Sequence, residues 1–158
     1  MKIIRRNVFE TNSSSTHSLI YVGPKSSEDY MAKNPTILVQ FIDTDDWRIL
    51  SSLEEKVSYL VSHIVNNYKY NCATYNDLVE QVTSDWDFKR LDNYVQEHFN
   101  KRIVFPEKYE YDLEDIVSIN HQLIESNFDN LLEDIMIDHH DYLEDILSSE
   151  YVIEIGHD

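Results

Sequence analysis

Glycine is nearly absent from this chain, which has only Gly23 and Gly156 among its 158 residues. Loops that cradle phosphates and turns that bind dinucleotides need glycine, because the backbone must approach the anion closely or adopt a positive φ. Neither of the two glycines lies in such a pattern. The sequence therefore excludes a nucleotide-binding enzyme of the P-loop or Rossmann kind.

Cysteine and long apolar runs are also scarce. Cys72 is the only cysteine, so the chain can form neither an intramolecular disulfide nor a thiolate zinc site, which fits a reducing compartment. No apolar run approaches the roughly 20 residues that a membrane-spanning helix requires. The opening segment MKIIRRNVFE lacks the uninterrupted apolar stretch of a signal peptide. We therefore expect a cytoplasmic protein without membrane contact.

Lysine and arginine do not occur after Lys108. The first 108 residues carry 13 basic and 15 acidic side chains, whereas residues 109–158 carry 15 acidic side chains and no basic ones, for a formal net charge of −17. Such a surface repels nucleic-acid phosphates, so we expect no direct binding to DNA or RNA and a basic protein as the natural partner. Acidity can also serve solubility alone. An ordinary solvated face, however, mixes charges of both signs.

The hydrophobic pattern predicts a small sheet. Strands are expected at residues 2–9, 17–22, 36–42, 101–105 and 151–155. The run TILVQFI at 36–42 is nearly all apolar, which is typical of a strand that is buried on both faces. A short helix at 28–33 must end before Pro35. Residues 109–125 fit a helix in their first half and an extended segment in their second.

Longer helices are predicted at 53–68, behind Thr74, at 85–99 and at 127–147. Ser52 and Glu55 match a capping box at the start of the first, and Thr74 with Asp77 repeats this spacing at the second. In the third, we expect Trp86 to face the core. The sum is a single α+β domain, a small mainly antiparallel sheet packed by three to five helices. Along the chain, residues 1–50 are strand-rich, 51–100 are helical, and 101–158 combine an acidic helix with a terminal strand.

The predicted helix at 127–147 carries carboxylates along the face opposite its apolar stripe. At spacings of three and four, like charges destabilise a helix by about 0.2–0.5 kcal/mol each. The carboxylates either dock onto a basic surface or imitate a nucleic-acid backbone, or they are only the solvated side of an amphipathic helix. Under the first interpretation, the partner-binding residues, flanked by Glu125 and Glu150, are Glu133, Asp134, Asp138, Asp141, Glu144 and Asp145.

Two groups of residues could support catalysis. Asp138, His139 and Asp141 offer metal ligands, but the adjacent His139 and His140 point about 100° apart on a helix, so both cannot easily bind one ion. The serines at 13–15 with His17 resemble a nucleophile and base, but no third group orients the base. We expect no catalytic residue, metal or cofactor. A metal-dependent hydrolase or nucleotide-modifying enzyme that uses these groups is the enzymatic alternative.

The segment RRNVFETNSSSTHSL, residues 5–19, resembles an N-terminal segment of small proteins from phages and other mobile elements of Gram-positive bacteria. Among these are anti-CRISPR proteins that inhibit type II effector nucleases, including a staphylococcal group that shares this region. The resemblance implies a non-enzymatic inhibitor in the cytoplasm of a bacterial host, with a guide-loaded type II CRISPR effector nuclease as its partner. Such a nuclease is basic because it holds RNA and DNA.

An inhibitor of this kind would block DNA cleavage by covering a nuclease domain or the nucleic-acid channel. The resemblance assigns no role to any single residue. From its composition alone, the segment from Thr11 to Ser18 is a connection between two strands, with hydroxyl groups that satisfy backbone amides. A second alternative is a phage accessory protein that antagonises another basic host factor, such as a restriction enzyme or a transcription protein.

Overall fold

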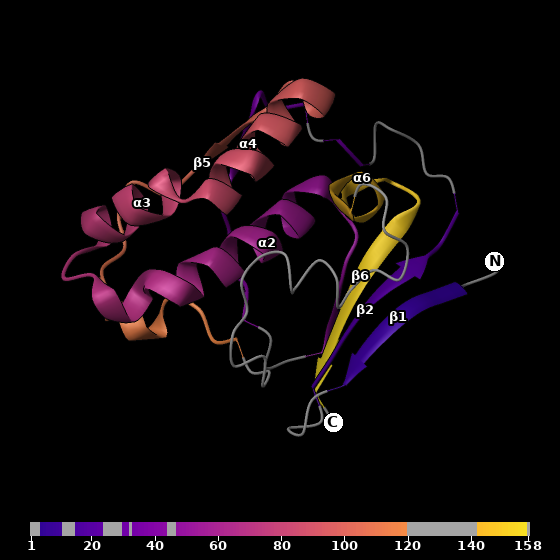
Figure 1. Ribbon diagram of the computed structural model, residues 1–158, viewed down its shortest axis with the longest axis horizontal. Coiled ribbons are helices and arrows are strands. Elements are labelled where there is room, and N and C mark those ends of the chain that lie inside the picture. The colour runs from indigo at the N-terminus through magenta and orange to yellow at the C-terminus, as the bar shows by residue number, and fades with distance from the viewer. Residues whose placement is uncertain are drawn as a thin grey trace.

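The computed structural model describes residues 4–10, 15–23, 30–31, 33–43, 47–119 and 142–157. These residues form the predicted α+β fold. Its main sheet has four strands, with β1 (Ile4–Glu10), β2 (Ser15–Tyr21), β6 (Tyr151–His157) and β4 (Arg48–Leu50) in that order and every neighbouring pair antiparallel. The last strand of the chain therefore lies inside the sheet (Figure 1). The sequence pattern missed β4.

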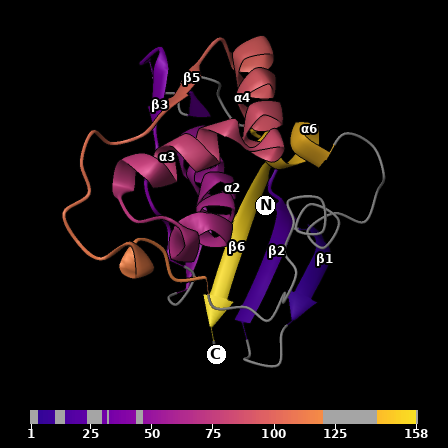
Figure 2. The same cartoon turned by 60° about the vertical axis from the view of Figure 1, so that its left-hand side comes forward.

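A second, two-stranded sheet pairs β3 (Thr36–Leu38) with β5 (Arg102–Val104) in parallel. Figure 2 shows the two strands side by side, apart from the four-stranded sheet. The prediction that residues 36–42 are buried on both faces is wrong, since Ile37 is buried but Leu38 is 56% exposed. In the described part of the chain, helices cover the Ile37 face of this small sheet and leave the Leu38 face exposed, which the apolar run could not reveal.

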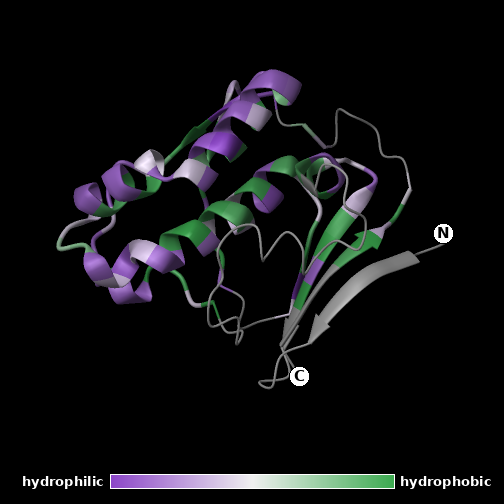
Figure 3. Ribbon diagram, in the orientation of Figure 1, coloured by the Kyte–Doolittle hydropathy of each residue, from purple (hydrophilic) through white to green (hydrophobic). Residues whose placement is uncertain are grey.

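Helix α2 (Leu53–Tyr68) occupies the centre of the molecule, between the four-stranded sheet and the helices α3 (Tyr75–Ser84) and α4 (Trp86–Phe99) (Figure 1). The predicted capping box is present, because Ser52 Oγ accepts a hydrogen bond from the backbone N–H of Glu55 at 3.1 Å and Glu55 accepts one from the backbone N–H of Ser52 at 3.4 Å. The core lies around α2, as the green ribbon of Figure 3 shows.

Helix α4 begins and ends at clear caps. Asp85 Oδ1 accepts hydrogen bonds from the N–H groups of Asp87 and Phe88, and Asn100 ends the helix with a left-handed φ of 54°. The prediction that Trp86 faces the core is wrong, because its side chain is 77% exposed. The buried face of α4 includes Phe88, and two residues correspond to about 200° of rotation, which turns Trp86 outward.

The remaining described elements are short. They are η1 (Lys69–Asn71), η2 (Leu113–Asp115) and α6 (Tyr142–Leu147). The first half of the segment 109–125 thus forms one 3₁₀ turn instead of an α-helix. The part of this segment from residue 120 onward lies outside the described residues. Of the predicted helix at 127–147, only α6 is described. Half of the predicted helix at 28–33, namely residues 28, 29 and 32, is likewise outside.

Three lysines of the described segments are buried, namely Lys56, Lys69 and Lys101, and each donates hydrogen bonds to backbone carbonyls. The ammonium of Lys56 binds the carbonyl oxygens of Ser148 at 2.8 Å and Tyr151 at 3.1 Å. It also lies 4.6 Å from the ring centroid of Tyr30, whose hydroxyl donates to the carbonyl of Leu147. Lys56 and Tyr30 together satisfy carbonyls at the end of α6.

Replacing Lys56 with methionine is expected to lower the free energy of unfolding by about 2–4 kcal/mol, because the carbonyls of Ser148 and Tyr151 lose a charged donor while staying buried. Chemical denaturation measures the difference. The matched control, Lys89→Met, changes an exposed lysine of α4 and is expected to leave stability unchanged. Equal stability of the two variants would contradict the role given to Lys56.

A hydrogen bond joins the end of α2 to the start of α4. The hydroxyl of Tyr68 donates to Asp85 Oδ2 at 2.5 Å, and this bond, together with desolvation and the charges of Asp85 and Asp87, raises the pKa of Tyr68 to about 12. The folded state therefore retains a proton that the unfolded chain loses near pH 10. The stabilisation is complete below pH 10 and disappears as the pH rises toward 12.

The variant Tyr68→Phe is expected to lose one phenol that titrates near pH 12 in the ultraviolet absorbance of tyrosinate. Its stability should also fall less steeply between about pH 10 and pH 12 than that of the unmodified chain, because the linked proton is gone. Denaturation at a series of pH values tests this. The same slope in both proteins would show that Tyr68 is not the linked group.

Candidate functional site

Two of the six predicted partner-binding residues, Glu144 and Asp145, lie on α6. Glu144 is exposed and Asp145 is half-buried, whereas Leu143, Ile146 and Leu147 of the same helix are buried. This turn therefore has the predicted apolar and acidic sides. The flanking Glu150 is half-buried before β6. The other predicted residues lie outside the described part of the chain: Glu125, Glu133, Asp134, Asp138 and Asp141.

The candidate catalytic groups are only partly described. Asp138, His139 and Asp141 lie outside the described residues, as do Ser13 and Ser14, while His17 belongs to β2 and is paired with Phe9 and Ile155 across the sheet. In the described ranges, no group of three or more His, Cys, Asp or Glu residues is placed to hold a metal ion. Nor does any helix in those ranges have the length and apolar character to span a membrane.

The structure brings together a second set of carboxylates that the sequence pattern did not single out. They surround the segment after β5, near η1 and η2, and they are mixed with tyrosines. We call this set the acidic–tyrosine patch and define it as Asp43, Tyr70, Tyr109, Glu110, Tyr111, Asp112, Glu114 and Asp115.

Tyr109 is the anchor of the patch. Its ring packs against those of Phe41 at 6.2 Å and Tyr75 at 6.1 Å between centroids, and against Tyr111 edge to face at 5.7 Å. The pKa of Tyr109 is raised, first by desolvation and then by negative charges, chiefly those of Asp115 and Asp43. Carboxylates from two distant parts of the sequence therefore gather around one phenol.

Hydrogen bonds to the main chain hold the patch in place. The hydroxyl of Tyr75 donates to the carbonyl of Pro106 at 2.6 Å, and the N–H of Ser118 donates to Asp43 Oδ1 at 2.7 Å. The buried ammonium of Lys69 donates to the carbonyls of Glu114 at 3.0 Å and Val117 at 2.7 Å. Because Lys69 binds carbonyl oxygens, it fixes the segment without taking a carboxylate of the patch as its partner.

The patch combines exposed rings with exposed charges. Tyr111 is 78% exposed and Tyr70 is 67% exposed, and the side chains of Glu110, Asp112, Glu114 and Asp115 are exposed as well. Tyrosine is enriched in protein interfaces and among the residues that dominate binding energy. This surface is suited to non-covalent contact with a cationic partner.

Most of the described carboxylates of the last third lie in two separate places, the acidic–tyrosine patch and the neighbourhood of α6, while Glu154 lies on β6. Lys56, in the first turn of α2, binds carbonyls next to α6, whereas Lys69, just past the last turn, binds carbonyls of the patch segment. Thirteen residues of helix separate these lysines, which corresponds to about 20 Å. Figure 1 shows α6 and the segment around η2 near opposite ends of α2.

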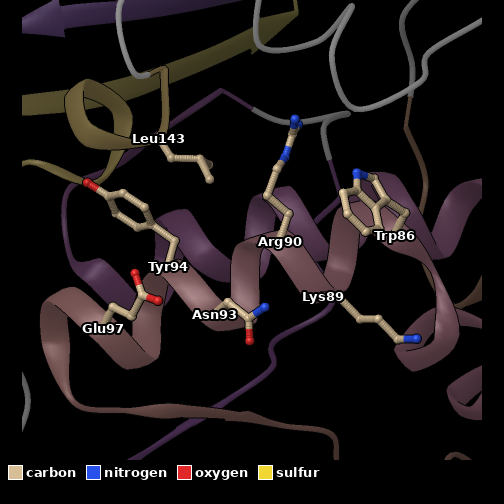
Figure 4. Close-up of a pocket in the computed structure, with 7 residues that line it drawn as sticks. All are labelled: Trp86, Lys89, Arg90, Asn93, Tyr94, Glu97 and Leu143. Atoms are coloured by element: carbon tan, nitrogen blue, oxygen red, sulfur yellow. The ribbon is translucent and has the colours of Figure 1, made fainter.

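A groove between α4 and α6 has a different character. It has a volume of about 390 Å³ and is lined by Trp86, Lys89, Arg90, Asn93, Tyr94, Glu97 and Leu143. Figure 4 shows Trp86, Arg90 and Tyr94 on one side of α4, with Leu143 of α6 nearby. With two cations and one carboxylate in its lining, this groove lacks the single sign of charge that distinguishes the acidic–tyrosine patch. Its exposed Trp86 supplies a control for the exposed Tyr111.

Replacing Lys69 with methionine is expected to accelerate hydrogen exchange of the amides at 114–118 by about tenfold or more, since hydrogen bonds from a charged donor contribute about 1.5–3 kcal/mol. Exchange measured by nuclear magnetic resonance or mass spectrometry gives the local rates. The control is Lys108→Met, an exposed lysine of the same segment, which is expected to leave them unchanged. Unaltered exchange in the Lys69 variant would refute the proposed anchoring.

Comparison of the chain with protein-family models, with curated proteins and with solved structures finds no match. The resemblance of residues 5–19 to segments of mobile-element proteins therefore stays a prediction. The described geometry offers exposed carboxylates and tyrosines on a fixed backbone, which suits the recognition of a basic surface.

Proposed function

We propose that this protein is a non-catalytic inhibitor that binds a guide-loaded type II CRISPR effector nuclease through its acidic surface and blocks DNA cleavage. The observation that carries the proposal is the acidic–tyrosine patch, in which Tyr70 and Tyr111 stand exposed among carboxylates. The N-terminal resemblance supports the choice of target, and the charge distribution supports the choice of surface.

The electrostatic support comes from complementarity. A guide-loaded nuclease holds its nucleic acids in a positively charged channel, so it presents basic surface to an acidic protein. Complementary charge accelerates association and excludes partners of the wrong sign, and it is screened over roughly 8 Å at physiological ionic strength. Inhibition is therefore expected to weaken as salt concentration rises.

The tyrosines support specific rather than diffuse attraction. A tyrosine ring presents a large contact area with only two side-chain torsions to fix, so little conformational entropy is lost when it is buried in an interface. In a channel built for nucleic acid, the ring can take the place of a base and the neighbouring carboxylates the place of phosphates. Because Lys69 and Tyr75 hold the backbone beneath, the patch is preorganised for binding.

Glu144 and Asp145 on α6 form a second acidic surface, apart from the acidic–tyrosine patch, which we call the α6 surface. In the proposal, this surface contributes together with Glu133, Asp134, Asp138 and Asp141, as the sequence predicts. The two surfaces can be separated experimentally, since the charge of each can be reversed without altering the other.

The test is a titration of the purified protein into a cleavage reaction of a guide-loaded type II nuclease, with binding of the target DNA followed in parallel. The variant Glu110→Lys/Asp112→Lys is expected to inhibit at least about tenfold less well, because two carboxylates of the patch become cations. The matched control, Glu80→Lys/Glu97→Lys, makes the same change of charge at exposed positions of α3 and α4 and is expected to retain inhibition.

A second pair of variants tests the rings. Tyr111→Ala is expected to weaken inhibition, whereas Trp86→Ala, which removes a ring of nearly equal exposure from the α4–α6 groove, is expected to preserve it. Circular dichroism verifies that all variants are folded. Loss of cleavage with DNA binding retained would indicate a covered nuclease domain, and loss of both would indicate an occupied channel.

Contrary outcomes are equally specific. Full inhibition by the Glu110/Asp112 variant, but none by a variant with Glu133, Asp134, Asp141 and Glu144 changed to lysine, would move the interface to the second acidic surface. No effect of the unmodified protein on several such nucleases would refute the proposed target. A different basic host factor would then be the partner to seek.

A further inference from the structure

The two-stranded sheet leaves one apolar face open to solvent. Leu38 of β3 and Val104 of β5 are partners in the parallel register, and they are 56% and 40% exposed. Ile37, on the opposite face of β3, is fully buried. The open face is thus a small exposed apolar patch on a strongly charged protein.

Serines of helix α2 accept hydrogen bonds from backbone N–H groups on the outer edge of the segment that continues β3. The N–H of Ile42 donates to Ser62 Oγ at 3.0 Å, and the N–H of Gln40 donates to Ser58 Oγ at 3.0 Å. Each step of two residues along the strand corresponds to one step of four along the helix. The next position in this series pairs Leu38 with Glu54, where a groove lies.

This groove has a volume of about 430 Å³ and is lined by Asn34, Thr36, Leu38, Gln40, Glu54 and Val104. Among the described residues of the lining, Glu54 alone is charged. It lies in the first turn of α2. The neighbouring Glu55 is already engaged by the capping box and by Arg48 at 3.7 Å.

The charges near the two ends of the groove differ, although Arg102 is outside its lining. Arg102, which is exposed, is the register partner of Thr36, whereas the series of helix and strand positions places Glu54 beside Leu38. A bound cation is attracted to the Leu38 end and repelled from the Thr36 end. The occupant must combine an apolar stem with a single positive head.

We propose that this groove binds an arginine or lysine side chain presented by an extended segment of a basic protein. The methylene stem lies across Leu38 and Val104, and the cationic head reaches the carboxylate of Glu54. The site is separate from the acidic–tyrosine patch and does not depend on the identity of the nuclease.

A second copy of this chain is the less suitable occupant. Each copy has a formal net charge of −17, so two copies repel each other, and neither can offer a basic residue from its last fifty residues. A basic partner gains from the same long-range field. Charge complementarity thus selects the occupant.

The test is a nuclear magnetic resonance titration of the full, isotope-labelled chain with the blocked tripeptide acetyl-Val-Arg-Val-amide. The amide signals of Leu38, Gln40 and Glu54 are expected to shift. The peptide acetyl-Val-Gln-Val-amide has a similar shape without the charge and is expected to bind about three- to fivefold more weakly, as for a partly exposed ion pair.

Variants separate the two parts of the site. Glu54→Gln is expected to abolish the preference for the arginine peptide, and Leu38→Ser is expected to weaken both peptides alike. The control Glu80→Gln changes an exposed carboxylate of α3 outside the groove and is expected to change neither. The remaining amide signals verify that each variant is folded.

Three results would overturn the proposal. They are equal binding of the two peptides, shifts confined to residues 110–115, and shifts at Leu38 that depend on protein concentration without peptide, which would assign the groove to a second copy. Failure of the protein to inhibit any nuclease would leave this site untouched, since the peptide titration involves no nuclease.

Discussion

The last third of the chain depends on cations that it does not contain. Residues 109–158 have no lysine or arginine, yet Lys56 of α2 and Lys69 of η1 place buried ammonium groups against their backbone carbonyls. Burying an ammonium is costly unless it is hydrogen-bonded, and the last carbonyls of a helical turn lack a partner within the helix. Helix α2 thereby determines where both acidic surfaces lie.

The choice of carbonyls rather than carboxylates as partners has a functional consequence. A lysine paired with a carboxylate would neutralise one charge of the surface, whereas these lysines bind carbonyls and leave the side chains of Glu114 and its exposed neighbours facing water. In Glu114 the backbone carbonyl is bound by Lys69 while the side chain stays exposed, whereas Asp43 uses its carboxylate to bind the N–H of Ser118. Reversing the surface charges should therefore affect binding far more than folding, which is the assumption behind the paired variants proposed for the patch.

Local patterns in the sequence predicted the local structure well. The spacing of Ser52 and Glu55 gave the start of α2, and the alternation in YVIEI gave β6. The failures concern relations between distant segments. The exposure of Leu38 depends on where the helices lie, the pairing of β3 with β5 joins residues more than sixty positions apart, and Trp86 faces solvent because Phe88 determines the buried side of α4. The sequence did not predict the acidic–tyrosine patch for the same reason, because the patch includes Asp43, which is far in sequence from the segment YEYDLED. The alternating tyrosines and acids of YEYDLED were the only local signal.

The geometry around α2 also constrains any single partner. A helix is a stiff spacer, so Lys56 and Lys69 hold the two acidic surfaces at fixed positions near opposite ends of α2. A partner that engages both gains from effective concentration, because the second contact forms within the complex, but only if its own basic surfaces match that spacing. A partner that engages one surface gains nothing from the other beyond long-range attraction. Two partners of equal basicity therefore differ in affinity when the arrangement of their charges differs. Because the spacing of the acidic surfaces is rigid, the partner must match it in shape as well as in charge.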